Sequence, residues 1–127
     1  MQSVVDVSKG RVVRSEDGVI AVLWDPGVVV EVADIETVLE AELSLLGTDD
    51  AIVMVDSREV RSMTRAAQRL TAQHPIAERT LALAILIAGP VSRMLGNFFL
   101  NVSRPSYPTR LFTDEELARA WLRSHRG

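Results

Sequence analysis

Three observations in the sequence predict one α/β domain with an N-terminal β-hairpin, a mainly parallel sheet and four helices. Ala51 to Val55 and Leu81 to Ala88 are unbroken apolar runs, typical of strands buried on both faces of a parallel sheet. Segments with helical periodicity alternate with these runs, which favours right-handed crossovers between parallel strands. The 127 residues, 47% of them hydrophobic, suffice for one core but not for two. We therefore expect a single domain over residues 1–127, with its core at about 10–124.

The first part of the chain predicts a β-hairpin. Arg11 to Arg14 and Val19 to Trp24 flank an Asp-Gly pair at Asp17 and Gly18, which is a strong signal for a tight turn between antiparallel strands. Val28 to Val32 is either a short edge strand or an extended approach to the first helix. The sheet is thus expected to start antiparallel and to continue with parallel strands.

Apolar residues at helical spacing predict helices over residues 34–46, 62–73 and about 90–103. A capping box at residues 113–116 predicts the start of a fourth helix. A last short strand, Thr109 to Phe112, precedes the fourth helix. Asp34 is expected to cap the first helix and Leu43 to lie on its buried face. The last helix is expected to bury Leu117 and to expose Arg119.

The composition limits the classes of protein to consider. Cysteine is absent, so disulfides and thiolate metal sites are excluded and the cytoplasm is the expected location. Charged residues interrupt the N-terminal segment, which does not resemble a signal peptide. No apolar run approaches the length of a membrane span, so we expect no membrane insertion.

Charge is unevenly distributed along the chain. Residues 1–57 carry 3 basic and 12 acidic side chains, a net charge of −9, whereas residues 58–127 carry 11 basic and 5 acidic ones, a net charge of +6. The two halves are expected to neutralise each other, either within the fold or across a homodimer. Since nucleic-acid binders are usually basic over the whole domain, we expect no nucleic acid partner.

Polar and charged residues follow the buried strands and are the candidate binding residues. In a parallel sheet the strand C-termini and helix N-termini share one rim, where free N–H groups attract anions. Asn97 and Asn101 are expected to be wholly or partly buried and hydrogen-bonded, because their neighbours are apolar. The candidate residues at this rim are Asp56, Ser57, Ser62, Thr64, Ser92, Arg93, Asn97 and Asn101.

The sequence carries no recognisable catalytic signature. His74 lies beside a proline and His125 lies in the C-terminal tail, and no glycine pattern of a nucleotide-binding loop or nucleophile elbow is present. We therefore expect a protein that is not an enzyme, with no catalytic residues, no metal site and no cofactor.

Two segments of the chain carry a resemblance to a known family. The first is Ile52 to Asp56 followed by Val60 and by Ser62 to Ala67. The second comprises Ser92 to Leu100 with Pro108 to Asp114 and with Trp121-Leu122. The first segment resembles the STAS domain, the fold of bacterial anti-sigma-factor antagonists, and the second is similar to a narrower group of uncharacterised bacterial STAS-like proteins. The resemblance covers about residues 10–124 and implies a mainly parallel sheet with a switch helix after the central strand.

The resemblance also implies a phosphorylation switch, from which this sequence departs. In signalling members a serine within Asp-Ser-Ser/Thr-Gly, at the start of the switch helix, is phosphorylated. The corresponding residues are Thr64, Arg65, Ala66 and Ala67, so Arg65 occupies the phosphoacceptor position. Ser62 is the expected N-cap of this helix. The standard phosphoserine switch is therefore not expected.

Two functional hypotheses follow. The first is a non-catalytic regulatory or protein-interaction module with a protein partner. Right-handed crossovers that proceed in one direction are expected to gather the helices largely on one face of the sheet, which leaves the other apolar face of the central strands to be covered. We expect a symmetric homodimer to cover it, unless the N-terminal hairpin curls over the sheet and closes it within one chain. The alternative is a module that binds a small anionic, nucleotide or lipid-like ligand at the rim.

Overall fold

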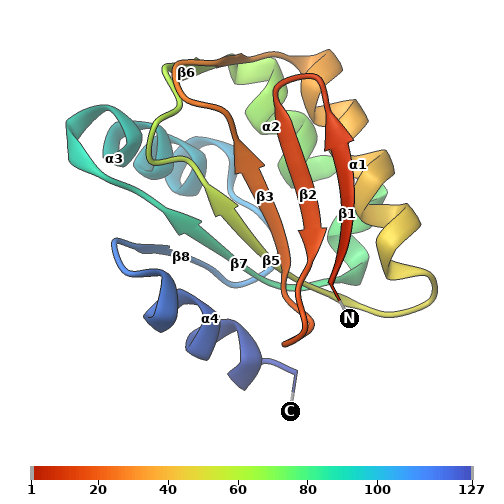
Figure 1. The fold of residues 1–127 in the computed structure, drawn as a ribbon. Coiled ribbons are helices and arrows are strands. Elements are labelled where there is room, and N and C mark those ends of the chain that lie inside the picture. Colours follow the sequence, from red (N-terminus) through yellow and green to blue (C-terminus); the bar gives the residue numbers. More distant parts are fainter. Residues whose placement is uncertain (1, 127) are drawn as a thin grey trace.

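The computed structural model describes residues 2–126, without the side chain of Val102. The strands are β1 (Ser3–Val7), β2 (Gly10–Arg14), β3 (Ile20–Trp24), β4 (Val29–Val30), β5 (Ala51–Asp56), β6 (Ser62–Met63), β7 (Thr80–Leu86) and β8 (Thr109–Phe112). The helices are α1 (Val32–Leu46), α2 (Arg65–Gln73), the 3₁₀-helix η1 (Pro75–Arg79), α3 (Gly89–Phe98), the π-helix η2 (Phe99–Ser103) and α4 (Glu115–Ser124). The predicted α/β class with four α-helices is confirmed (Figure 1).

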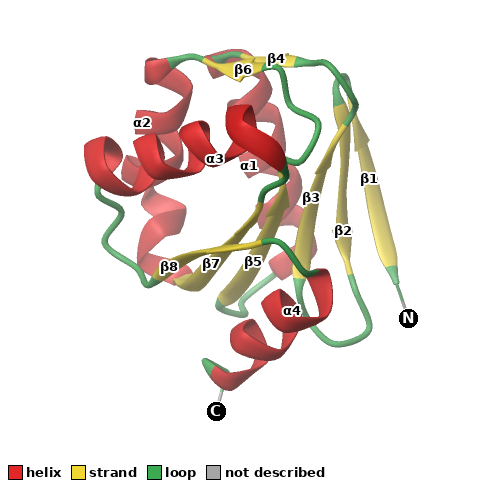
Figure 2. Cartoon of the chain, turned by 90° about the vertical axis from the view of Figure 1, so that its left-hand side faces the viewer, coloured by secondary structure: helices red, strands yellow, loops and turns green. Residues whose placement is uncertain are grey.

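The main sheet has six strands in the order β1-β2-β3-β5-β7-β8. The pairs β1–β2 and β2–β3 are antiparallel, whereas β3, β5, β7 and β8 run parallel. The sheet is curled, so that β1 to β3 stand at an angle to the other strands (Figure 2). β4 and β6 form a separate parallel pair, so the segment after the hairpin is a short strand outside the main sheet. The edge strand β1 was not predicted.

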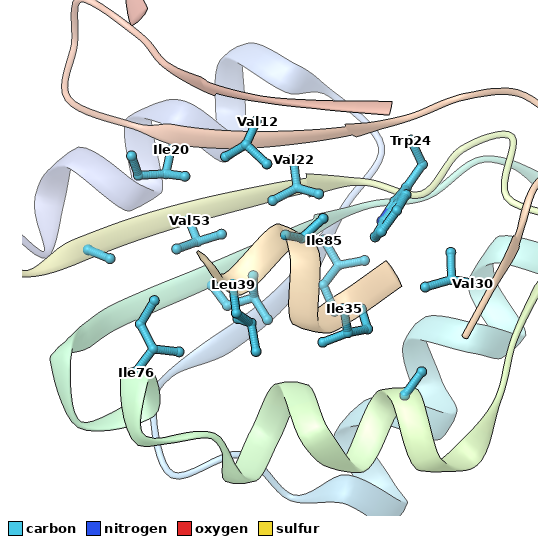
Figure 3. Packing of buried hydrophobic residues seen from close by; sticks show 14 of the residues in the cluster. Val12, Ile20, Val22, Trp24, Val30, Ile35, Leu39, Val53, Ile76 and Ile85 are labelled. Atoms are coloured by element: carbon cyan, nitrogen blue, oxygen red, sulfur yellow. The ribbon is translucent and has the colours of Figure 1, made fainter. Parts of the chain in front are cut away.

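Helices α1, α2 and α3 cover one face of the sheet. Each lies in a connection between neighbouring parallel strands, and consecutive right-handed crossovers that proceed in one direction place their helices on the same side. Figure 3 shows the core on this face, where Val22, Val53 and Ile85 of the strands lie opposite Ile35 and Leu39 of α1. This arrangement of helices confirms the one predicted from the strand order.

The opposite face of the sheet is covered by α4 (Figure 2). Ala118 and Leu122 of this helix pack on Ile52, Met54 and Leu86, all of which are fully buried. The central strands are therefore buried on both faces within one chain, as their unbroken apolar pattern predicts. The expectation of a homodimer assumed that this face needs a second copy, and α4 removes that reason. The homodimer stays a prediction that light scattering can test.

The first residues of α1 and α2 differ from the predicted ones, because capping hydrogen bonds fix where each helix begins. α1 begins after Glu31, and Asp34 acts three residues into the helix, where its Oδ2 accepts from the Glu31 N–H at 2.8 Å and from Lys9 Nζ at 2.7 Å. α2 begins after Thr64, whose Oγ1 accepts from the Ala67 N–H at 3.1 Å. Ser62, the predicted cap, lies in β6, because this residue pairs with Val29.

Two apolar residues expected in the core lie at the surface. Leu43 is 37% exposed and Leu117 is 64% exposed. In α4 the side facing the sheet carries Ala118 and Leu122, so a residue one position before Ala118 points away from it. Among residues 2–126, no helix is long and apolar enough to cross a membrane.

Candidate functional site

A cavity of about 80 Å³ lies between the sheet and the helices of the α1–α3 face. We call it the Trp24 cavity. Its wall comes from β3, β5 and β7 on one side and from α1, α2, α3 and η2 on the other. A single buried water needs roughly 10–15 Å³ of such space, so the cavity has room for a small molecule. Its polar wall residues are Trp24, Glu42, Ser57, Gln68, Thr71, Thr80 and Tyr107, and the rest of the wall is apolar.

Two polar atoms in this wall lack a hydrogen-bond partner among the described residues. These are Nε1 of Trp24 and Oε1 of Gln68, in residues that are only 9% and 3% exposed. Trp24 is the last residue of β3 and its ring lies among the core side chains of the α1–α3 face (Figure 3). The indole N–H can only donate and the amide oxygen can only accept. One donor and one acceptor without a partner thus belong to residues of the cavity wall, and both atoms are themselves buried.

Glu42 places a carboxyl group in the same wall. It is 5% exposed on the buried side of α1, and burial raises the pKa of its carboxyl group to about 8. Burial also raises the pKa of the nearby Tyr107 hydroxyl, and the charge of Glu42 adds to this effect. The Tyr107 hydroxyl donates to the Thr71 carbonyl at 3.3 Å. At neutral pH both groups are largely uncharged, so the cavity is almost entirely neutral.

The predicted rim residues at the end of β5 serve the fold. Asp56 is half-buried, and its carboxylate accepts from Arg58 Nε at 2.9 Å and from Nη2 at 2.7 Å. Burial raises the pKa of Asp56, but the hydrogen bonds from Arg58 outweigh it and hold this pKa below its usual value. Ser57 is buried and borders the Trp24 cavity. Of the predicted site residues, Ser57 is thus the one that reaches the cavity.

Of the remaining candidate residues on α2 and α3, two form hydrogen bonds at the start of a helix and the others are exposed to solvent. Thr64 caps α2, and the buried Ser92 hydroxyl donates to the Ala88 carbonyl at 2.6 Å. Arg93, Asn97 and Asn101 are exposed.

The prediction that Asn97 and Asn101 are buried is wrong. Ser92, Gly96 and Phe99 are buried, and their spacing shows that they form the side of the helix facing the sheet. The two asparagines lie on another side, which faces solvent.

The residues that define the cavity were missed by the sequence reasoning. Glu42 follows Ile35 by seven residues and Leu39 by three, so it lies on the apolar stripe of α1. A carboxylate within an apolar stripe indicates a buried polar site, and this pattern could have pointed to the cavity. Gln68 and Tyr107 carried no comparable signal. Among residues 2–126, no group of three or more histidine, aspartate or glutamate side chains is placed to hold a metal ion.

A family model for a domain of unknown function, DUF7793, matches residues 13–126, so the chain belongs to this family. No protein of curated function matches the sequence.

An uncharacterised DUF3478-family protein from Shewanella loihica PV-4, described as having a SpoIIAA-like fold, is similar in structure. The TM-score is 0.60 at 16% identity, over 96% of this chain and 92% of the other. The likeness shows a SpoIIAA-like, that is STAS-like, fold and confirms the predicted resemblance. A protein of unknown function from Arthrobacter sp. FB24 is 29% identical over 93% of this chain and 95% of its own, but the TM-score of 0.36 is too low to indicate a shared fold.

Proposed function

We propose that this DUF7793 protein is a non-catalytic regulatory module that binds a small, largely apolar molecule in the Trp24 cavity. The observation that carries the proposal is the pair of unpartnered atoms, Trp24 Nε1 and Gln68 Oε1, in the cavity wall. Buried polar groups nearly always have a partner, because each one left unpaired costs roughly 1–3 kcal/mol. A bound molecule with one acceptor and one donor would remove both costs once the two side chains turn these atoms toward it.

The chemistry of the wall supports binding rather than catalysis. Catalysis needs an acid, base or nucleophile that is held against the reacting atom. Glu42 is largely protonated at neutral pH because burial raises its pKa to about 8, and the Tyr107 hydroxyl is engaged with the Thr71 carbonyl. Neither group is hydrogen-bonded to a serine or histidine among the described residues. A neutral, mostly apolar wall suits a ligand of similar character.

The fold supports the regulatory part of the proposal. STAS-like domains include the anti-sigma-factor antagonists, and a module in the cytoplasm without a cofactor agrees with the composition. A protein partner is the second candidate, favoured by the outer side of α3, where Val91 is 50% exposed and Met94 is 63% exposed. The rim as an anion site has less support, because the carboxylate of Asp56 lies there.

The test uses Trp24 as its own reporter. The protein has two tryptophans, so a Trp121→Phe variant leaves Trp24 as the only source of indole fluorescence. Nucleotides, inorganic phosphate, straight-chain fatty acids and small apolar alcohols are screened for a change in emission and for a rise in Tm. A compound bound in the cavity is expected to change both.

A matched pair of variants locates the binding. Val38 lines the cavity and Leu43 is exposed on the same helix. Val38→Phe, made in the Trp121→Phe background, is expected to fill the cavity and abolish the response, whereas Leu43→Phe is expected to keep it. The proposal is wrong if no compound changes Trp24 emission. Binding of phosphate or nucleotides that Val38→Phe leaves intact would instead place the site at the rim.

A further inference from the structure

The Trp24 cavity is elongated along the strands of the sheet. Trp24 ends β3 and Thr80 begins β7, and both residues line the cavity. Thr80 pairs with the first residue of β5, whereas Trp24 comes directly after the residue that pairs with the last one. Trp24 and Thr80 therefore lie roughly 20 Å apart along the strand direction. Figure 3 shows Trp24 at one end of the core and Ile76, which closely precedes Thr80 in the sequence, at the other.

Helices α1 and α2 place Gln68 and Glu42 toward opposite ends of this cavity. α1 leads into β5, and α2 with η1 leads into β7, so both helices end at the edge of the sheet where these strands begin. Gln68 lies in the first half of α2 and thus toward Trp24. Glu42 follows Ile35 by seven residues and lies roughly 10 Å further along α1, toward Thr80. One end therefore has the unpartnered donor and acceptor, and the other has a carboxyl group.

The carboxyl group of Glu42 has no partner of its own. Among the described residues it makes neither a hydrogen bond nor an ion pair, although the residue lines the cavity and is only 5% exposed. The hydroxyl groups at this end donate to main-chain carbonyls instead, Thr71 to Ala67 at 3.1 Å, Thr80 to Ile76 at 2.9 Å and Tyr107 to Thr71 at 3.3 Å. Because no donor stabilises a carboxylate here, burial keeps the group largely protonated at neutral pH.

A protonated carboxyl group offers one donor and one acceptor side by side. A primary carboxamide also has an acceptor beside a donor, so the two groups can form a pair of parallel hydrogen bonds without any charge. A carboxylate would bring a buried charge without a partner. An ammonium group would require Glu42 to ionise, and both ions would lose their hydration. The carboxyl group of Glu42 therefore favours an uncharged amide.

The other end and the middle of the cavity limit the rest of the ligand. A hydroxyl group can accept from Trp24 Nε1 and donate to Gln68 Oε1 once these side chains turn toward it. Between the two ends the wall is formed by apolar side chains such as Leu39 and Val53. The cavity volume of about 80 Å³ has room for roughly five to eight water-sized groups, which suits a short unbranched chain.

From this arrangement we propose that the ligand is a short, uncharged hydroxy amide, with its hydroxyl group at Trp24 and Gln68, its hydrocarbon chain along the apolar wall and its carboxamide group on Glu42. This inference rests on the proposed function, because it names the class of ligand for the same cavity. It meets the unpaired donor and acceptor at one end and adds a partner for the carboxyl group at the other. Glu42 is then the residue that selects uncharged ligands.

The test changes one end of the probe at a time. Straight-chain ω-hydroxyalkanamides of about four to eight carbons are titrated at neutral pH against the Trp121→Phe protein, beside the primary alcohols, ω-hydroxy acids and ω-amino alcohols of the same chain lengths. Fluorescence of Trp24 gives Kd. The amides are expected to bind about tenfold or more tightly than the matched alcohols. The acids and the amines, which are charged at this pH, are expected to bind more weakly than the alcohols.

The pH dependence separates an amide on the protonated carboxyl group from an amine on the carboxylate. Amide binding is expected to weaken above about pH 8, because Glu42 then loses the proton that it donates. Among the described residues, Glu42 and Tyr107 are the titratable groups of the wall. Burial raises the pKa of the Tyr107 hydroxyl well above this range. An amine would instead bind more tightly as pH rises toward 8.

Variants at position 42, made in the Trp121→Phe background, identify the group responsible. Glu42→Leu is expected to abolish the preference for amides and to leave the affinity for alcohols nearly unchanged. Glu42→Gln keeps a donor beside an acceptor, so it is expected to retain the preference but not its decline above about pH 8. Glu40→Gln, exposed on the same helix, is the matched control and is expected to change neither. Circular dichroism and Tm confirm that each variant is folded.

The outcomes distinguish this inference from the proposed function. If alcohols bind as tightly as the hydroxy amides, or if Glu42→Leu leaves the preference intact, the ligand class is wrong while the cavity remains a binding site. The inference is also wrong if the amino alcohols bind most tightly and gain affinity as pH rises, which would show that Glu42 binds as a carboxylate. If no compound of any class changes Trp24 emission, both proposals fail.

Discussion

Nη1 of Arg119 lies 3.2 Å from Oδ2 of Asp17, and this ion pair joins the last helix to the turn between β2 and β3. Nη1 of Arg123 lies 3.2 Å from the same oxygen, and Nε of Arg119 lies 3.0 Å from Oε2 of Glu115. Burial raises the pKa of Asp17, but the hydrogen bonds from the Val19 N–H and Arg119 outweigh it and keep this pKa below its usual value. Asp17, in the acidic first half of the chain, thus pairs within the fold with two arginines of the basic second half.

Arg119→Leu is expected to lower the free energy of unfolding by about 1–2 kcal/mol, because it leaves Asp17 with weaker compensation in a partly buried network. Asn97→Leu is expected to have an effect within about 0.5 kcal/mol, since Asn97 is exposed. This order reverses the one that a buried Asn97 would give. Urea unfolding of the two variants measures it, and equal midpoints would show that the network contributes little.

Met54→Asp is expected to prevent folding, because Met54 is fully buried against α4 and an unpaired charge there costs about 4 kcal/mol or more. Leu117→Asp is the control. Leu117 is 64% exposed in the first turn of α4, where an acidic residue is favourable. Soluble expression and circular dichroism separate the two variants. A folded Met54→Asp protein with an unchanged Tm would contradict the packing of α4 on this strand.

The architecture was predictable from sequence because the strongest signals were long and local. The unbroken run from Ala51 to Val55 predicted a strand buried on both faces, and Asp17-Gly18 predicted the hairpin turn. What failed was the assignment of particular residues to the buried side of a helix. Asn97 is exposed because Ser92 and Gly96 face the sheet, and small residues give a weak hydrophobic pattern. The packing of α4 on the second face of the sheet was hard to predict for the same cause, because it depends on Ala118, which is also a small residue.

The candidate site was less predictable than the fold. The rim was expected to bind ligands, but Asp56 is paired with its neighbour Arg58, an interaction that sequence patterns do not favour over others. The Trp24 cavity brings together Trp24, Gln68 and Tyr107, which are far apart in the sequence, and no local pattern links them. Only Glu42, on the apolar stripe of its helix, carried a signal for a buried polar site.

Gly10→Ala is expected to destabilise the protein by about 2 kcal/mol or more, because the added Cβ would overlap the carbonyl oxygen of Leu23. Gly10 pairs with Trp24 across the β2–β3 ladder, so the emission of Trp24 is expected to shift as well. Ser8→Ala, at an exposed position of the preceding turn, is expected to change neither. Thermal unfolding and fluorescence of the Trp121→Phe background measure both effects. An alanine variant with unchanged Tm and emission would show that the β2–β3 ladder separates easily at this point.

The last prediction concerns pH and Glu42. Burial raises the pKa of its carboxyl group from 4.5 to about 8 in the folded protein, so between these values the folded state binds more protons than the unfolded state. The free energy of unfolding therefore falls as pH rises across this interval, by up to about 1.4 kcal/mol for each pH unit from this group. The stability linked to the protonated Glu42 carboxyl group is fully present below pH 4.5 and is lost above about pH 8.

Glu42→Gln removes this titration and keeps the size of the side chain. The free energy of unfolding of both proteins is measured by urea titration at a series of pH values. The value for Glu42→Gln minus that for the wild type is expected to increase as pH rises from 5 to 8, roughly the range between the two pKa values. Glu40→Gln, at an exposed position of the same helix, is expected to follow the wild type. Parallel curves for Glu42→Gln and the wild type would mean that the Glu42 carboxyl group reaches solvent and ionises normally in the fold.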